Sequence, residues 1–98
     1  MKYDVVLAPS VRIWMRGLEF GERQELLLAI QSELRLNDPR TREVPGKLGT
    51  FVREILGYHV YYRGLKELEK ERYALRAGYM VLAISEIDGF PLKGGHAG

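Results

Sequence analysis

The chain of 98 residues has no cysteine, only two histidines and only a small net charge of +2. Without cysteine it has no disulfide bonds, no thiolate metal sites and no cysteine nucleophile. Two histidines, one of them in a glycine-rich tail, argue against a histidine-based zinc site, and we expect neither a metal nor a cofactor. No apolar run approaches the roughly 20 residues of a membrane-spanning helix, and the N-terminal residues lack a secretion signal. We therefore expect a cytoplasmic protein that does not contact a membrane.

The positive charge is concentrated in the middle of the chain. Residues 40–66 carry six basic and two acidic side chains, a balance of +4, whereas residues 1–39 and 67–98 each have a balance of −1. Aromatic residues are interleaved with these basic ones, a pattern typical of proteins that bind a polyanion such as RNA. The alternative interpretation is an ordinary solvated basic surface.

The first third of the chain predicts one strand and two helices. Residues 3–7 read as a short strand that ends before Pro9, and Ser10 is the expected cap of the helix that follows. An amphipathic first helix is indicated by the spacing of Val11, Trp14, Met15 and Leu18. The second helix is expected from Glu22 to Leu36, ending at Asn37-Asp38-Pro39, with a buried stripe of Leu26, Leu27, Ile30 and Leu34.

The remainder of the chain predicts strands. A basic loop over residues 40–49 leads into a hairpin, residues 64–71 fit a turn, a short helix or a hairpin extension, and residues 79–84 form a buried strand with a bulge or bend at Gly78. The order predicts an α+β fold, in which a strand and a two-helix hairpin precede about three antiparallel strands and the helices cover one face of the sheet. We expect one domain over residues 1–87 and a flexible glycine-rich tail over residues 88–98.

The hairpin of residues 49–63 is the main candidate for a functional site. A three-residue loop ending at Gly57 places Arg53 opposite His59. One face then holds Phe51, Arg53, His59, Tyr61 and Arg63, and the other holds Val52, Glu54, Tyr58, Val60 and Tyr62. A two-residue loop would instead place Glu54 beside His59, because a slip of one residue exchanges the faces of a strand.

The order of elements and several motifs resemble the RelE/ParE superfamily of bacterial type II toxins. These motifs are Asp38-Pro39 after the second helix, Phe51 and Arg53 on a strand behind a basic loop, and a turn and strand over residues 57–62 (GYHVYY). The resemblance implies a RelE-type toxin that cleaves mRNA on the ribosome, with no metal, and that an antitoxin protein neutralises. The alternatives are a ParE-like inhibitor of DNA gyrase, a catalytically silent member, and an unrelated small α+β binding module.

The same resemblance implies roles for eight residues. Arg53 and His59 are the central catalytic residues, with Glu43 as a possible base in the loop and Arg76 as a substitute cation. Contacts with RNA are expected from Lys47, Tyr61, Arg63 and Lys66. The chain departs from the family pattern after its last strand, where residues 85–89 (SEIDG) stand in place of the usual basic or aromatic side chains.

Overall fold

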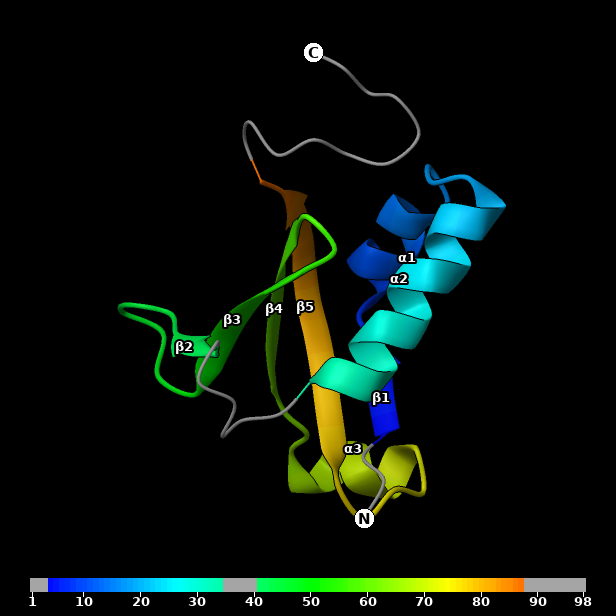
Figure 1. The fold of residues 1–98 in the computed structure, drawn as a ribbon. Coiled ribbons are helices and arrows are strands. Elements are labelled where there is room, and N and C mark those ends of the chain that lie inside the picture. Colours follow the sequence, from blue (N-terminus) through cyan, green and yellow to red (C-terminus); the bar gives the residue numbers. More distant parts are fainter. Residues whose placement is uncertain (1–3, 35–40, 88–98) are drawn as a thin grey trace.

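A computed structural model describes residues 4–34 and 41–87, which form an α+β fold of five strands and three helices (Figure 1). The elements are β1 (Asp4–Leu7), α1 (Pro9–Met15), α2 (Phe20–Glu33), β2 (Arg42–Glu43), β3 (Thr50–Ile55), β4 (Tyr58–Gly64), α3 (Glu67–Arg72) and β5 (Gly78–Glu86). The predicted helix stop at residues 37–39 and the predicted tail at residues 88–98 lie outside the described residues. Within the described part, no helix combines the length and the apolar character needed to cross a membrane.

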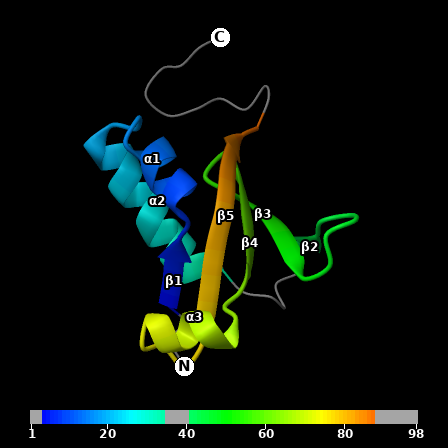
Figure 2. The same ribbon diagram turned by 180° about the vertical axis from the view of Figure 1, so that it is seen from behind.

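The sheet has the strand order β1-β5-β4-β3-β2, which differs from the predicted arrangement (Figure 2). The α+β class is confirmed, but the strand number and order are not, because β1 joins the sheet as a parallel neighbour of β5, and β2 adds a short strand at the other edge. The helical pair carries the chain far enough for β1 to lie parallel to a later strand, since parallel pairing needs a long connection. The remaining strand pairs are antiparallel.

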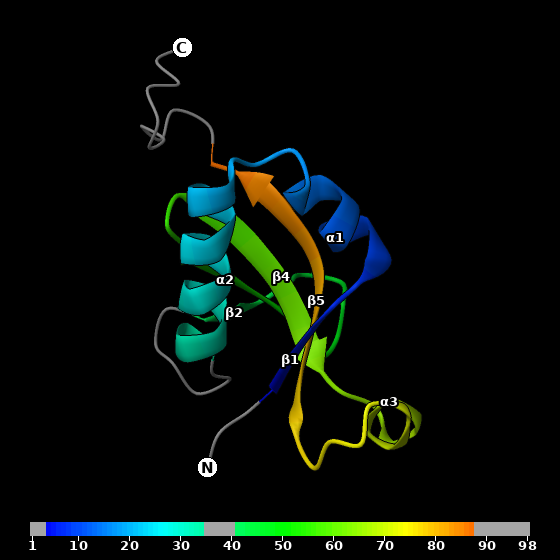
Figure 3. The ribbon, with the colours of Figure 1, turned by 90° about the vertical axis from the view of Figure 1, so that its right-hand side faces the viewer.

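Helices α1 and α2 lie together on one face of the sheet (Figures 1 and 3). Helix α1 begins at Pro9, whose fixed backbone angle suits the first helical position, so Ser10 lies inside the helix and its predicted role as the cap is wrong. Helix α2 begins at Phe20, two residues before the predicted start. The helices bury Val11, Met15, Leu26 and Ile30, as their spacing predicts.

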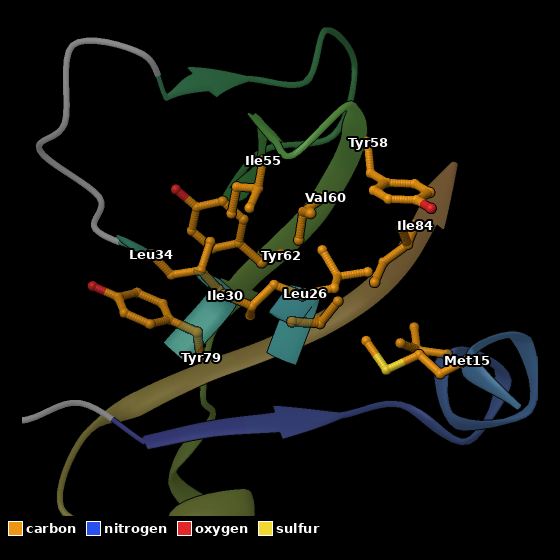
Figure 4. Close-up of a cluster of buried hydrophobic side chains, with 12 residues drawn as sticks. Met15, Leu26, Ile30, Leu34, Ile55, Tyr58, Val60, Tyr62, Tyr79 and Ile84 are labelled. Carbon is orange, nitrogen blue, oxygen red and sulfur yellow. The ribbon is translucent and has the colours of Figure 1, made fainter. Parts of the chain in front are cut away.

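The main core lies between these helices and the sheet (Figure 4). Its centre is completely buried, with exposed fractions of 0% for Ile30, Val60, Tyr62 and Val81. The Tyr62 ring packs edge-on against Tyr79, with the ring centres 5.6 Å apart, and its hydroxyl lies 2.8 Å from Thr41 Oγ1. Even-numbered residues of β4 therefore face the helices, which leaves its odd-numbered residues on the opposite face.

Within residues 4–34 and 41–87, the opposite face of the sheet is covered at one end. There, Val6, Leu65 and Met80 form a second cluster, against which Leu75 packs. Residues 65–75 contain α3, so this segment forms a short helix, the second of the three conformations that its sequence allowed. Gly78 begins β5 directly after a bend at residues 76–77, whereas the irregular pairing lies between Tyr61 and Tyr62, so of the predicted bulge or bend at Gly78 the bulge is wrong.

Candidate functional site on the open face of the sheet

The β3–β4 turn has two residues, Leu56 and Gly57, and the prediction of a three-residue loop is wrong. Ile55 pairs with Tyr58, and both turn residues have positive φ angles of 51° and 86°. A turn with two positive φ angles follows the natural twist of the strands, which favours this tight connection. As a result, Glu54 is the partner of His59, and Arg53 is the partner of Val60.

Arg53 therefore belongs to the helix-covered face, and its predicted position beside His59 is wrong. Its side chain is buried, with an exposed fraction of 1% for the residue. Arg53 Nη2 lies 2.8 Å from Glu33 Oε1, and Nη1 donates to the backbone carbonyl of the same glutamate. Glu33 is the last residue of α2, where the partial negative charge of the helix end favours a cation. Arg53 thus joins α2 to β3.

We use the term open face for the side chains of β2–β5 that point away from α1 and α2 outside the second apolar cluster. Two rows of paired residues cross it from strand to strand. One row contains Arg42, Val52, Tyr61 and Ala83, and the other contains Glu54, His59 and Ser85. Every member is exposed or half-buried. The open face combines a basic, an imidazole, a phenol, a hydroxyl and a carboxylate side chain.

His59 is the middle member of the second row, next to the hairpin turn. Its side chain is 30% exposed, and Nε2 lies 3.7 Å from Glu54 Oε1, on a glutamate side chain that is 59% exposed. The Tyr61 ring lies on the same strand face, edge-on to the imidazole, with ring centres 6.4 Å apart. An accessible imidazole is suited to proton transfer near neutral pH, and the adjacent phenol offers an aromatic surface and a hydroxyl.

Arg63 lies on the same face as His59 and Tyr61, as predicted, but it is engaged in an ion pair with α3. Its two terminal nitrogens each lie 2.7 Å from a carboxylate oxygen of Glu69, which also accepts the backbone N–H of Lys66. The hydrogen bond from Arg63, followed by that from Lys66, lowers the pKa of Glu69 from 4.5 to about 2. The same pair raises the pKa of Arg63. Arg63 therefore contributes to holding the start of α3 in place.

Glu43 and Lys47 lie in the β2–β3 connection. Glu43 is paired with Phe51, which places it on the opposite face from His59, and its Oε2 accepts the backbone N–H of Gly49 at 3.1 Å. It thereby orders the loop. Lys47 is exposed at the loop tip, beside a shallow hollow of about 300 Å³ that Glu43 also lines.

Arg76 and Lys66 lie at the other end of the sheet, close to α3. Arg76 lines a hollow of about 400 Å³ together with Glu67 and Lys70. Gly78 and Ser85 are seven positions apart, which corresponds to about 23 Å along a strand, so Arg76 and His59 are far apart. Of the eight predicted residues, His59, Tyr61 and Arg63 share one face of the sheet, and of these His59 and Tyr61 lie side by side.

Three further side chains of the open face had no role in the sequence prediction. Arg42 pairs with Val52, and both Glu54 and Ser85 pair with strand β4 at His59. The signal that pointed to Glu54 was the alternative interpretation of the hairpin, in which a two-residue loop places Glu54 beside His59. Nothing in the sequence pointed to Arg42, because a strand of two residues leaves no recognisable pattern.

The residues described here contain no group of three or more histidine, aspartate or glutamate side chains arranged to hold a metal ion. Comparison with models of protein families and with curated proteins finds no match for this chain.

Proposed function

We propose that the chain is a RelE-type toxin of the RelE/ParE superfamily, which acts in the cytoplasm by cleaving mRNA on the ribosome and is neutralised by an antitoxin protein. The observation that carries this proposal is the position of His59 on an open sheet face between Tyr61 and Glu54. A flat face with an accessible imidazole suits a flexible polymer better than a small metabolite, which is usually bound in a concave pocket.

The proposed reaction transfers a phosphoryl group within the RNA chain, from the 5′-oxygen to the neighbouring 2′-oxygen. His59 takes the proton of a ribose 2′-hydroxyl, whose oxygen then forms a bond to the adjacent phosphorus. The bond between phosphorus and the 5′-oxygen breaks, and the departing oxygen takes a proton from water. The products are a 2′,3′-cyclic phosphate and a 5′-hydroxyl end. The nucleophile comes from the substrate, so the protein needs only to orient the RNA and move the proton.

Two other side chains of the open face are suited to holding the RNA. Tyr61 offers an aromatic ring on which a base can stack, which is how single-stranded RNA is commonly bound. Arg42 lies in the same row as Tyr61, on the outer strand, and is exposed. Its guanidinium can pair with a phosphate oxygen. Exposed Lys47 adds positive charge at the edge of the same strands.

The proposal is tested by adding the purified protein to a translation reaction and mapping the 5′ ends of the mRNA. We expect cleavage that is confined to mRNA engaged by ribosomes, and we expect His59→Gln to reduce it about 100-fold or more. Arg12→Gln is the matched control, because Arg12 is exposed on α1, away from the open face. Intact mRNA in the presence of the native chain contradicts the proposal.

A second candidate function is protein binding, as in a ParE-like inhibitor of DNA gyrase or a catalytically silent member. It is favoured by large apolar side chains exposed on the helical layer, among them Phe20 at 70% and Ile13 and Leu28 at 64%. The engagement of Arg53 and Arg63 in ion pairs also leaves fewer cations for RNA. Normal translation together with loss of gyrase supercoiling would favour this function. Both functions predict a small antitoxin, encoded by a neighbouring reading frame, that co-purifies with the chain.

A further inference from the structure

A carboxylate, an imidazole and a hydroxyl side chain form one row across three neighbouring strands. Glu54 on β3 pairs with His59 on β4, which pairs with Ser85 on β5, and all three lie on the open face. The hairpin turn creates this row, because only the two-residue connection brings Glu54 beside His59. Glu54 is a side chain that a polyanion-binding surface would be expected to lack, since it repels phosphate.

The contact between the two side chains involves one particular nitrogen of the imidazole. His59 Nε2 lies 3.7 Å from Glu54 Oε1, longer than a hydrogen bond but within the range of an ion pair. Such contacts in an active site are often long before the substrate binds and shorten in the complex. A neutral imidazole carries one proton, and the bond that one nitrogen makes decides where that proton is held.

We propose that Glu54 is a positioning residue for His59, which holds the imidazole proton on Nε2 and leaves the lone pair of Nδ1 to accept a proton. The negative carboxylate attracts Nε2–H across the 3.7 Å contact, and this contact also limits the rotation of the ring. The substrate then reaches the ring on its Nδ1 edge, with the Ser85 hydroxyl as a neighbouring donor for a phosphate oxygen. The role of Nδ1 as the base rests on the proposed nuclease function, whereas the control of the proton position does not.

The first test measures the imidazole directly, with the protein alone and no RNA. Two-bond ¹H–¹⁵N correlation spectra of His59 above neutral pH report which nitrogen carries the proton. We expect Nε2–H in the native chain and, in Glu54→Ala, a shift of the Nε2 resonance with a mixture of the two tautomers. Unchanged populations in Glu54→Ala overturn the proposal, whether or not the chain cleaves RNA.

The second test separates positioning from charge. If Glu54 were only a surface charge, Glu54→Gln would remove a repulsion and would improve both RNA binding and cleavage. We expect binding that is equal or tighter, together with cleavage at saturating RNA that falls about 10- to 100-fold, by analogy with carboxylates that support metal-bound histidines. Glu54→Asp should recover part of the rate.

Glu86→Gln is the matched control for the second test. It removes the same charge from an exposed position on β5, but Glu86 is paired with Tyr58 and so belongs to the opposite face of the sheet. We expect no loss of cleavage. A rate that rises in Glu54→Gln, or that falls equally in Glu86→Gln, overturns the proposal. Complete absence of cleavage in the native chain contradicts the proposed function instead, and the first test still decides the role of Glu54.

Discussion

The two faces of the β3–β4 hairpin carry charged residues with opposite relations to solvent. On the helix-covered face, Arg53 is buried and paired with Glu33 at the end of α2. On the open face, Glu54 of β3 and His59 of β4 are accessible and lie beside each other. The two basic side chains are close in sequence and on adjacent strands. Their difference shows that residue type does not distinguish a buried basic side chain from an accessible one, whereas strand register does.

This comparison changes the meaning of an experiment on Arg53. Replacing the buried Arg53 by alanine leaves the Glu33 carboxylate with fewer partners and leaves a void in the core. A loss of activity after Arg53→Ala therefore reflects loss of the fold. For a substitution on the open face we expect the opposite result, a loss of activity without a loss of stability. The predictions below are therefore paired measurements of stability and of function.

The largest effect is expected for Arg53→Ala, with a fall of about 3 kcal/mol in the free energy of unfolding, because it removes a completely buried side chain with its contacts to Glu33 and leaves a void. Urea denaturation followed by circular dichroism measures it. Arg53→Met is the control, since its long apolar side chain fills most of the void and should recover part of the loss. A stable Arg53→Ala chain that has lost RNA cleavage would return Arg53 to the functional site.

For His59→Gln we expect a loss of cleavage of about 100-fold or more, the usual contribution of a proton-transferring group. The free energy of unfolding should change by no more than about 0.5 kcal/mol, because the side chain lies at the surface of the sheet. Cleavage assays and urea denaturation on the same preparation provide both numbers. A large loss of stability with unchanged cleavage would show that His59 has a structural role and no catalytic one.

Much of the fold was predictable from the sequence, but the site was predictable only in part. The periodic apolar residues of α1 and α2 and the alternation along β4 identified their buried sides correctly, because periodicity survives small errors in element ends. The faces of β3 were exchanged, because loops of two and of three residues both place Gly57 where a positive φ angle is needed. Leu56 also hid the tight turn, since asparagine or glycine is usual at its position.

Two other features depend on contacts between distant parts of the chain. Strand β1 has four residues, and its own sequence contains nothing that selects β5 as a parallel neighbour. The start of α3 depends on Glu69, which accepts a hydrogen bond from the backbone of Lys66 and pairs with Arg63 on the preceding strand. A charged segment on its own does not reveal such a partner.

An effect of about 1 kcal/mol is expected for Glu69→Gln at neutral pH, since the paired side chains lie near the surface. The pKa of Glu69 is lowered from 4.5 to about 2 in the folded chain, so its stabilising contribution is present above pH 4.5 and is lost as the pH falls towards 2. Urea denaturation at several pH values should show a weaker decrease in that window for Glu69→Gln. An unchanged pH dependence contradicts this role of the Arg63–Glu69 pair.

The smallest effect is an increase in stability. Leu56 is 47% exposed and has a φ angle of 51°, a conformation that asparagine adopts at lower cost. We expect Leu56→Asn to raise the free energy of unfolding by about 0.5 kcal/mol and to leave the position of Glu54 beside His59 unchanged. Thermal denaturation measures the first effect, and the His59 spectra measure the second. Lower stability in Leu56→Asn would show that the leucine side chain has a packing role at the turn.

The two-residue turn also constrains how this protein can evolve. Most surface loops tolerate an inserted residue with little effect, because loop closure depends only weakly on length. At Leu56-Gly57, an insertion that shifted β3 by one residue would move Arg53 out of the core and bring Glu54 into it. A single inserted codon would thus alter the core and the candidate site together. We expect relatives of this chain to vary the residues of this turn while preserving its length.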